Sequence, residues 1–401
     1  MIKTKPEVLM VLEGEIATTH LIERILLACK PYGVRYRKQF LSTLKIQDFH
    51  PNTIPLFVRC GDPALEDWVD LLRRAKHPYI YYIDDNFWRI QGDSPLARYY
   101  RHPIVRRSLE LAVTHASKVL TNSVELASFL ARFNKEIETL PSFFDFSLID
   151  GCVRGQGGEI RIGFAGSPSR DVDLEIIRPA ILPILDEFPS AVFEFAGVMP
   201  KGLSQSDRIR FFPHQSDYSG FVRFLAERNW SVGLAPLVDN EANRCKTNNK
   251  YREYGACEIA GIYTNMPPYQ NSVAHEITGL LVENTTEAWI SAIGRLCGNK
   301  SENDEMGRRA CEDVRHKHCV ERVSGLWADC LVKVDKHIRA HPGVPLKMVV
   351  RRINLRKLRS KVDAFRMQVF TAYGMGGVSL VMSKSMARVR AIELPWGSAK
   401  K

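Results

Sequence analysis

The chain has 401 residues, of which 45% are hydrophobic and 25% are charged. This length is sufficient for two domains with separate cores, and the composition excludes a disordered or membrane-embedded chain. The formal net charge is +11 at pH 7, and residues 345–401 alone carry 13 Lys or Arg against 2 Asp or Glu. The rest of the chain is therefore close to neutral, and we do not expect nucleic acid as its partner.

The nine cysteines form no Cys-x-x-Cys pair and no regular framework. Several lie inside apolar or helical patterns, including Cys29, Cys60, Cys257 and Cys297. Such usage is typical of a reducing compartment. Acidic residues follow the short apolar run near the N-terminus at once, which does not fit a signal peptide. We therefore expect a cytoplasmic protein.

In the first half of the chain, runs rich in β-branched and aromatic residues alternate with helical patterns. They predict strands at 7–12, 34–40, 56–60, 79–84 and 118–123, and helices at 20–30, 63–76, 94–117 and 124–133. Near-continuous apolar strands in this alternating order indicate a parallel sheet covered on both faces. We place the first domain at residues 1–145.

The second half repeats this architecture after Pro and Gly residues break the pattern between 143 and 158. We place a linker at 146–158, a second domain at 159–340 and a basic tail at 341–401. Strands are predicted at 160–166, 191–197, 208–214, 230–237, 261–265 and 279–284, and helices at 286–297 and 302–337 close the domain. The expected fold class is α/β, with two doubly wound, Rossmann-like domains facing each other across a cleft.

The stretch GFAGSPSRD, residues 163–171, is the first candidate binding motif. A predicted strand ends at Gly166 and Ser167, and a helix begins near Asp171. Small residues in such a turn let a ligand approach the backbone, and the helix start offers free N–H groups to an anion. The dinucleotide fingerprint Gly-x-Gly-x-x-Gly is absent, which disfavours a nicotinamide site. The alternative is a tight turn in which Ser169 or Asp171 only caps the helix.

The stretch RCKTNNKYREYGACEIAG, residues 244–261, is the second candidate motif. Thr247 is a suitable N-cap, which would place Lys250 in the first helical turn. The positive helix end and the ammonium groups of Lys246 and Lys250 would then converge on a diphosphate. Glu253 shares a helix face with Lys250, and a carboxylate there can accept hydrogen bonds from ribose hydroxyls. The alternative is a solvated helix end with a Lys–Glu pair.

From residue 160 to about 323 the chain resembles the catalytic domain of glycosyltransferase family 4 enzymes, which have the GT-B fold. The matching segments follow the family's order and spacing: IGFAGSPSRDVDLEII, SVGLAPL, NKYREYGACEIAGIYTN, HEITGLLVENTTEAW and RRACEDVRHKHCVERV. The N-terminal half is less closely similar, through YIYYIDDNFW, VLTNSVELASFL and LPSFFD. The resemblance implies transfer of a sugar from a nucleotide sugar, with retention of anomeric configuration and without an obligatory metal or other cofactor.

The resemblance also assigns roles to residues of the second motif. Glu253 matches the second of the family's two glutamates, which implies contact with the donor ribose, and Lys250 matches the lysine three residues before it. Cys245 stands where the first glutamate is expected. We therefore expect Lys246, beside it, to contact the diphosphate instead.

The family's Gly-Arg…Lys-Gly pair after the first strand of this domain is missing too. The segment GSPSRD stands in its place, with Ser167 and Arg170 as substitutes. The residues predicted to bind the donor are thus Gly166, Ser167, Arg170, Lys246, Lys250 and Glu253.

In the N-terminal half, the segment IDDNFW ends a strand where related enzymes often carry His-Asp. Asp84 and Asp85 would point into the cleft, where a carboxylate can orient an acceptor hydroxyl or take its proton. The alternative is a helix cap or an Asx turn. His102 in YYRHP is a third catalytic candidate, or else part of a loop before a proline. The segment Glu13-Gly14-Glu15 fits the family's glycine-rich acceptor loop weakly.

A group of cysteines and histidines near the end of the second domain invites comparison with zinc sites. It consists of Cys311, His316, His318 and Cys319. Their spacing is not that of a standard zinc finger, and the surrounding pattern is helical. We therefore predict structural roles for these residues and no metal site.

The resulting prediction is a cytoplasmic glycosyltransferase that moves a sugar from a nucleotide-sugar donor to a glycan or lipid-linked acceptor. Two alternatives stay open. One is a nucleotide-sugar epimerase of the same fold, which needs no separate acceptor. The other is a non-catalytic binding or scaffold protein, to which the replacement at Cys245 would point.

The basic tail contains a charge-free stretch, 367–383, that is too short and too polar to span a bilayer. Basic clusters flank this stretch on both sides, which suits a segment lying at an anionic membrane surface. We predict peripheral attachment to the inner face of the membrane. The alternatives are packing of the tail against the N-terminal domain and, third, a nucleic-acid-binding arm.

Overall fold

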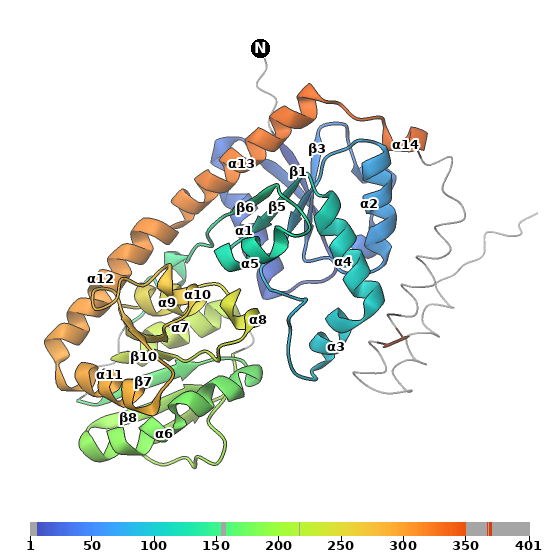
Figure 1. Cartoon of the computed structure of the whole chain (residues 1–401). Helices are drawn as coiled ribbons and strands as arrows, with labels where there is room; N and C mark the ends of the chain where they lie inside the picture. The colour runs from blue at the N-terminus through green and yellow to red at the C-terminus, as the bar shows by residue number, and fades with distance from the viewer. Residues whose placement is uncertain (1–5, 154–157, 216, 350–366, 368, 371–401) are drawn as a thin grey trace, which may run out of the picture.

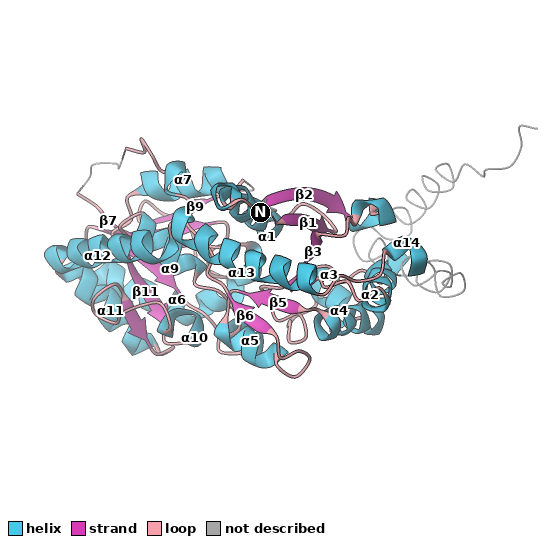
Figure 2. Ribbon diagram, turned by 90° about the horizontal axis from the view of Figure 1, so that it is seen from above, coloured by secondary structure: helices cyan, strands magenta, loops and turns pink. Residues whose placement is uncertain are grey.

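The computed structural model describes residues 6–153, 158–215, 217–349, 367, 369 and 370. Two α/β domains are each built on a six-stranded sheet with helices on both faces (Figures 1 and 2). All strand pairs within the two sheets are parallel. The predicted fold class is therefore confirmed.

The N-terminal sheet has the strand order β2-β1-β3-β4-β5-β6. Its strands are β1 (Glu7–Leu12), β2 (Arg35–Phe40), β3 (Thr53–Val58), β4 (Ile80–Tyr82), β5 (Lys118–Thr121) and β6 (Ile137–Thr139). The helices of this half are α1 (Ala17–Ala28), α2 (Ala64–Arg74), α3 (Pro95–Arg101), α4 (Pro103–His115) and α5 (Val124–Leu130). Only β6 lacks a sequence prediction, because this three-residue strand is only partly buried and has no apolar run.

The C-terminal sheet has the order β12-β11-β10-β7-β8-β9. Its strands are β7 (Ile160–Ala165), β8 (Ala191–Ala196), β9 (Ile209–Phe212), β10 (Val232–Ala235), β11 (Ala260–Thr264) and β12 (Leu280–Val282). The helices of this half are α6 (Asp171–Glu187), α7 (Tyr218–Arg228), α8 (Glu241–Arg244), α9 (Asn249–Ala256), α10 (Pro267–Gln270), α11 (Thr286–Gly298), α12 (Lys300–His318), α13 (Val320–Ala340) and α14 (Leu346–Val349). All six predicted strands are present.

Two helices predicted as continuous are divided in the structure. The pattern at 94–117 forms α3 and α4, which separate at His102, because a residue before proline disfavours the helical region. The pattern at 302–337 forms α12 and α13, which separate at the extended residue Cys319. The break lets α13 leave the C-terminal sheet and cross to the N-terminal domain (Figure 1). There Trp327 and Leu331 pack into the N-terminal core.

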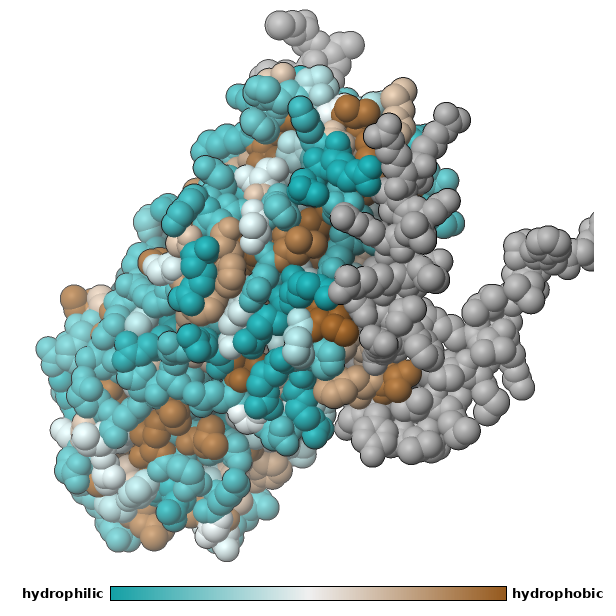
Figure 3. Space-filling view, turned by 45° about the vertical axis from the view of Figure 1, so that its right-hand side comes forward, coloured by the Kyte–Doolittle hydropathy of each residue, from teal (hydrophilic) through white to brown (hydrophobic). Residues whose placement is uncertain are grey.

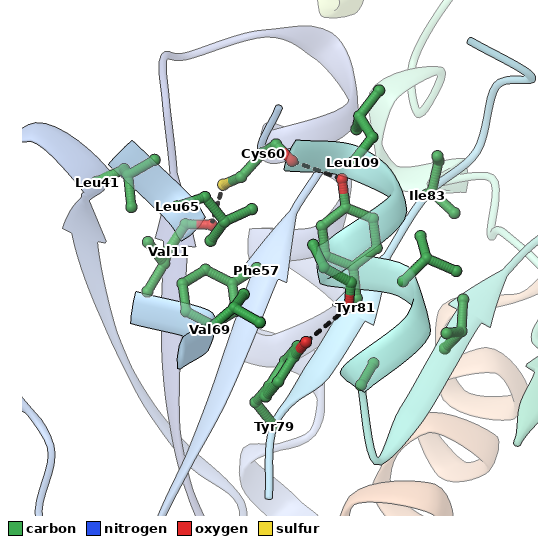
Figure 4. Packing of buried hydrophobic residues seen from close by; sticks show 14 of the residues in the cluster. Val11, Leu41, Phe57, Cys60, Leu65, Val69, Tyr79, Tyr81, Ile83 and Leu109 are labelled. Atoms are coloured by element: carbon green, nitrogen blue, oxygen red, sulfur yellow. Dashed lines mark hydrogen bonds between the residues drawn. The ribbon is translucent and has the colours of Figure 1, made fainter. Parts of the chain in front are cut away.

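Strand β1 shows why the strands of this fold are apolar throughout. Residues 8–12 are all fully buried, and they alternate between two clusters on opposite faces of the sheet. Helices α1 and α13 cover one face, and α2 and α4 cover the other. On the second face Tyr81 donates a hydrogen bond to the Cys60 carbonyl (2.6 Å), and the Cys60 thiol lies 3.5 Å from the Val11 carbonyl (Figure 4). These bonds fix the end of β3 against β1.

The chain also passes from the N-terminal to the C-terminal domain after β6. This segment and the junction of α12 and α13 meet at one hinge. The Phe144 N–H donates to the His318 carbonyl (2.9 Å), and His318 Nδ1 lies 2.9 Å from the Ser142 carbonyl. Arg252 of α9 donates to the Phe143 carbonyl (2.7 Å). Burial, together with the charge of Arg252, lowers the pKa of His318 to about 4. His318 is thus a neutral residue of the hinge, held by its contacts with Ser142 and Phe144.

The start of the tail lies against the N-terminal domain. Leu346 of α14 and Met367 are buried in its core, and the ring of Phe370 lies 5.1 Å from that of His102. The remainder of the predicted membrane-surface segment is outside the described residues. No helix in the described part of the chain is long and apolar enough to cross a bilayer. The face seen in Figure 3 is mainly hydrophilic, with apolar residues in separate small patches.

Candidate active site

A pocket of about 240 Å³ lies between the two domains. The start of α1 provides one wall, and the ends of β7, β8 and β9 with parts of α7 and α9 provide the others. The lining residues are Ala17, Gly166, Ser167, Ala196, Gly197, His214, Gln215, Tyr218, Phe221 and Lys250. Three of the six residues predicted to bind the donor therefore meet here, and they come from two separate motifs.

Two glycines open the wall of this pocket. The Gly166 N–H donates to the Ala196 carbonyl at 3.0 Å, which brings the ends of β7 and β8 together. Gly197 has a φ of +85°, and a Cβ atom there would lie 2.2 Å from the Gly166 carbonyl oxygen. A Cβ atom at Gly166 would lie 2.9 Å from the ring of Phe164. Both positions therefore need glycine, for backbone conformation or for close approach.

Of the two predicted substitutes in GSPSRD, the structure brings only Ser167 to the pocket. Arg170 Nε forms an ion pair with the buried Asp173 carboxylate at 3.0 Å. Asp173 also accepts a hydrogen bond from the Val238 N–H at 2.7 Å, and burial raises its pKa despite Arg170. Arg170 thus stabilises the start of α6 rather than lining the pocket.

Helix α9 presents Lys250 to the pocket and holds it with Glu253. Lys250 Nζ lies 2.7 Å from Glu253 Oε2 and 5.2 Å from the centre of the Phe221 ring. The two charged side chains are 19% and 8% exposed, so this pair is not the solvated pair of the alternative interpretation. The predicted cap, Thr247, is wrong by one residue: Asn248 is the N-cap. Its side chain donates to Ser272 (2.9 Å) and accepts from the Arg252 side chain (3.1 Å), and it makes no capping hydrogen bond to the helix backbone.

Cys245 and Lys246 lie outside the pocket, at a contact between the domains. Cys245 is 5% exposed, packs with the N-terminal core and accepts a hydrogen bond from Asn86 at 3.4 Å. Lys246 Nζ lies 3.9 Å from Asp85 of the other domain. The position of the family's first glutamate is therefore occupied by an interdomain packing residue.

Asp84 and Asp85 follow β4 and share a cation, Arg59, at the end of the neighbouring strand β3. Arg59 Nη1 lies 3.1 Å from Asp84, and Nη2 lies 3.3 Å from Asp85. Thr18 of α1 accepts a hydrogen bond from Arg59 (2.8 Å) and donates one to Asp84 (2.7 Å). Burial raises the pKa of Asp84, and Arg59 opposes this shift. The partners of Asp84 are distant in sequence, which the alternative of a local Asx turn does not explain.

Sequence reasoning missed Arg59. Its φ is +54°, a left-handed conformation that is uncommon for a long side chain and is found preferentially at functional sites. No sequence pattern marks this residue, because its partners come from α1 and β4. The aromatic and polar pocket residues Tyr218, His214 and Gln215 were missed for the same reason.

The structure does not bring His102 to the pocket. Its Nδ1 accepts a hydrogen bond from the Ile104 N–H (3.3 Å), so it caps α4, and its ring contacts Phe370. The contacts recorded for His102 are those of a structural residue.

No family model and no curated protein matches the chain. Solved structures do match. Anabaena HepE in complex with UDP superposes with a TM-score of 0.61 and 12% identity, covering 82% of this chain and all of that one. Sucrose-phosphate synthase from Thermosynechococcus elongatus gives 0.60 and 12% over 83% of this chain and all of that one. TarM gives 0.54 and 13% over 77% of this chain and 58% of that one. The chain therefore has the GT-B fold of these glycosyltransferases.

Proposed function

We propose that this protein is a glycosyltransferase that binds a nucleotide sugar in the interdomain pocket. The observation that carries the proposal is the joint placement of the glycine turn, Ser167 and the Lys250–Glu253 pair at one pocket of a GT-B fold. These groups come from distant motifs, and together they offer a wall without Cβ atoms, a hydroxyl, a cation and a carboxylate.

The proposed donor lies with its diphosphate beside Ser167 and Lys250. Negative charge develops on this leaving group during transfer, so a fixed ammonium group stabilises the transition state more than the bound substrate. Glu253 holds Lys250 in place and offers its second carboxylate oxygen to the ribose hydroxyls. Tyr218 and Phe221 supply aromatic faces for the base. Solved complexes of HepE contain UDP and UDP-glucose, so these ligands are the first probes to use.

The proposed acceptor, a glycan or lipid-linked glycan, approaches from the N-terminal domain. Asp84 and Asp85 lie at the carboxyl end of its sheet, opposite the C-terminal domain that lines most of the pocket. Their carboxylates can orient an acceptor hydroxyl for attack on the anomeric carbon. We propose retention of configuration and no role for a metal. Among the described residues one group, Glu15, His20 and Glu23, has metal-ligand spacing, but Lys38 already pairs with both of its carboxylates.

Thermal-shift measurements with UDP, GDP, ADP and their glucose conjugates test the donor site. A ligand at one hundred times its Kd stabilises the folded state by ~2.7 kcal/mol. We expect one nucleotide series to raise the melting temperature of the wild type and to lose this effect in Lys250→Ala. No shift with any nucleotide would contradict the proposal.

Acceptor dependence separates transfer from the two alternatives. A glycosyltransferase releases nucleotide faster when an acceptor glycan is added, whereas an epimerase turns over its nucleotide sugar alone. The scaffold alternative is favoured by one observation, since Cys245 packs into the domain contact rather than facing the pocket. Tight nucleotide binding without turnover would support it.

We also propose that the basic tail attaches the enzyme to an anionic membrane surface. The support is its charge, 13 Lys or Arg against 2 Asp or Glu in residues 345–401, and the return of Met367 and Phe370 to the N-terminal domain, the side from which the acceptor approaches. A location on the inner face of the cytoplasmic membrane would bring a lipid-linked acceptor to the cleft.

A further inference from the structure

Glu13, at the carboxyl end of β1, is a charged residue that the proposed function does not yet use. Its Oε1 accepts hydrogen bonds from the N–H groups of Gly61 (2.6 Å) and Asp62 (2.5 Å), in the loop between β3 and α2. The residue is still exposed to solvent. No other residue described in the structure donates a hydrogen bond to its second oxygen. The two amides therefore fix the carboxylate while leaving one oxygen open to a ligand.

The loop that holds Glu13 is itself rigid. Tyr81 donates to the Cys60 carbonyl (Figure 4), and Asp62 Oδ1 accepts from the Ala64 N–H at 2.8 Å. A Cβ atom at Gly61 would lie 3.3 Å from Val105, so α4 packs closely on the loop. A carboxylate held by such a loop keeps its direction before a ligand arrives, which is the condition for positioning a hydroxyl.

The surroundings of Glu13 disfavour its charged form. Desolvation by the neighbouring protein atoms, with the charge of Asp62, raises the pKa of its carboxyl group to about 7, although the two amides and Arg59 oppose the shift. The charged and titratable groups around it are Arg59, Cys60, Asp62, Tyr81, Tyr99 and Tyr100. Both protonation states are therefore populated at neutral pH.

Arg59 connects Glu13 to the acceptor edge, because its charge acts on Glu13 as well as on Asp84 and Asp85. Along this edge the three carboxylates of Glu13, Asp84 and Asp85 outnumber the cations of Arg59 and Lys246. Like charges repel in such partly desolvated surroundings, so a phosphate or carboxylate on the reacting end of an acceptor is disfavoured. Hydroxyl groups suit the edge, since each can donate a hydrogen bond to a carboxylate.

We propose that Glu13 is an acceptor-positioning residue whose free oxygen accepts a hydrogen bond from a hydroxyl group of an uncharged sugar. The acceptor class is then a glycan with a neutral polyhydroxyl end, even where a phosphate lies farther along the molecule. This inference rests on the proposed function and adds to it the class of acceptor and the residue that selects it.

The test compares Glu13→Gln with wild type and with Glu23→Gln, a control on α1 whose carboxylate pairs with Lys38 away from this edge. Glutamine keeps an oxygen for the two amides, so the loop should stay folded, but the variant cannot be a carboxylate. The acceptors are methyl β-glucoside and methyl β-glucuronide, which differ only at C6, where the first has a neutral hydroxymethyl group and the second a carboxylate. The donor is the nucleotide sugar that the thermal-shift screen selects.

We expect nucleotide release by the wild type to be at least about tenfold faster with the glucoside than with the glucuronide. Glu13→Gln should lower kcat/KM for the glucoside by about tenfold or more, with unchanged nucleotide affinity and melting temperature. The wild-type kcat/KM should fall as pH decreases through about 7, and this inflection should be absent in Glu13→Gln. Glu23→Gln should behave as the wild type does.

A measurement without turnover keeps the two proposals distinguishable. In protein labelled with ¹³C at the glutamate carboxyl carbons, the resonance missing from Glu13→Gln should titrate near pH 7 and shift on addition of the glucoside, with the nucleotide that the screen selects bound. No shift with the glucoside, a larger shift with the glucuronide, or a wild-type kcat/KM in Glu13→Gln would overturn the role of Glu13. Failure of every nucleotide to bind would instead contradict the proposed function.

Discussion

The two sides of the interdomain cleft are built from opposite chemistry. On the C-terminal side, glycine backbone, Ser167 and aromatic rings line the pocket together with Lys250, which is the one Lys or Arg among its described lining residues and pairs with Glu253. On the N-terminal side, Arg59 is surrounded by Asp84, Asp85 and Glu13. A lysine in a pocket whose described lining includes no Asp or Glu suits an anion, and several carboxylates around a single cation suit hydroxyl groups.

In the proposed function, this difference separates the two substrates by charge. The diphosphate of the donor would bind on the first side, whereas a neutral sugar would use the carboxylates of the second. Domain contacts such as Arg89 with Glu241 (2.6 Å), Lys246 with Asp85 (3.9 Å) and Asn86 with Cys245 bring the two sides together. The predictions below change each side separately.

The largest effect is expected from Gly197→Ala on the pocket side. The new Cβ atom would overlap the Gly166 carbonyl at 2.2 Å, in a residue whose φ is +85°. We expect a loss of nucleotide binding and of several kcal/mol of stability, measured by calorimetry and denaturant unfolding. Gly202→Ala is the matched control, since its φ is +73° but no atom lies within 4 Å. Equal losses in both variants would show that the positive φ, rather than the contact with the Gly166 carbonyl, causes the loss of stability.

The hinge between the two sides should make the fold sensitive to acid. His318 has a pKa of about 4 in the folded protein, below its ordinary value near 6.5, so the unfolded chain takes up the proton first as pH falls. Stability should therefore be lost as pH decreases from about 6.5 to about 4, by up to ~3 kcal/mol. His318→Gln should flatten this dependence in unfolding experiments, while His20→Gln, at the surface, should not. A steep loss of stability at acid pH that persists in His318→Gln would show that other titrating groups cause it.

Replacing Lys250 by alanine should weaken donor binding by ~1.5–3 kcal/mol, because a charge-assisted contact to the diphosphate is lost and Glu253 is left without its partner. The control is Lys201→Ala, in which a largely exposed lysine loses a surface ion pair with Asp171. Isothermal titration calorimetry with the selected nucleotide compares the Kd values of the two variants. A Kd in Lys250→Ala equal to that of the control would remove Lys250 from the donor site.

Asp84→Asn tests the acceptor side with a smaller expected effect. Asparagine can still accept the hydrogen bond from Thr18, but the attraction to Arg59 is lost. We expect kcat/KM for the acceptor to fall by about tenfold, ~1.4 kcal/mol, with unchanged nucleotide affinity. Asp70→Asn, on the surface of α2, is the control. A loss of nucleotide binding in Asp84→Asn would break the separation of the two sides.

The smallest effect on catalysis is expected from removing residues 371–401, which keeps Met367 and Phe370 in place against the N-terminal domain. Turnover with soluble substrates should be unchanged, while co-sedimentation with anionic vesicles at low salt should decrease, because basic residues near such a surface contribute about 1 kcal/mol each. Equal sedimentation of the full and shortened chains would remove this segment as the membrane attachment.

Local sequence determined the sheets and the motifs. Fully apolar strands such as β1 can only be buried on both faces, so they indicated parallel sheets, and glycines at strand ends indicated where a ligand can approach. The spacing of Lys250 and Glu253 along one helix fixed their pairing, since residues three apart on a helix are neighbours.

Only the tertiary structure decided which residues from different elements meet. It buried Cys245 in the domain contact and brought the ring of His102 against Phe370 of the tail. It also placed Arg59 between α1 and β4, where no pattern in the sequence could locate it. Local spacing governs contacts within one helix or turn, whereas a site formed at strand ends depends on the order of strands in the sheet and on the docking of two domains.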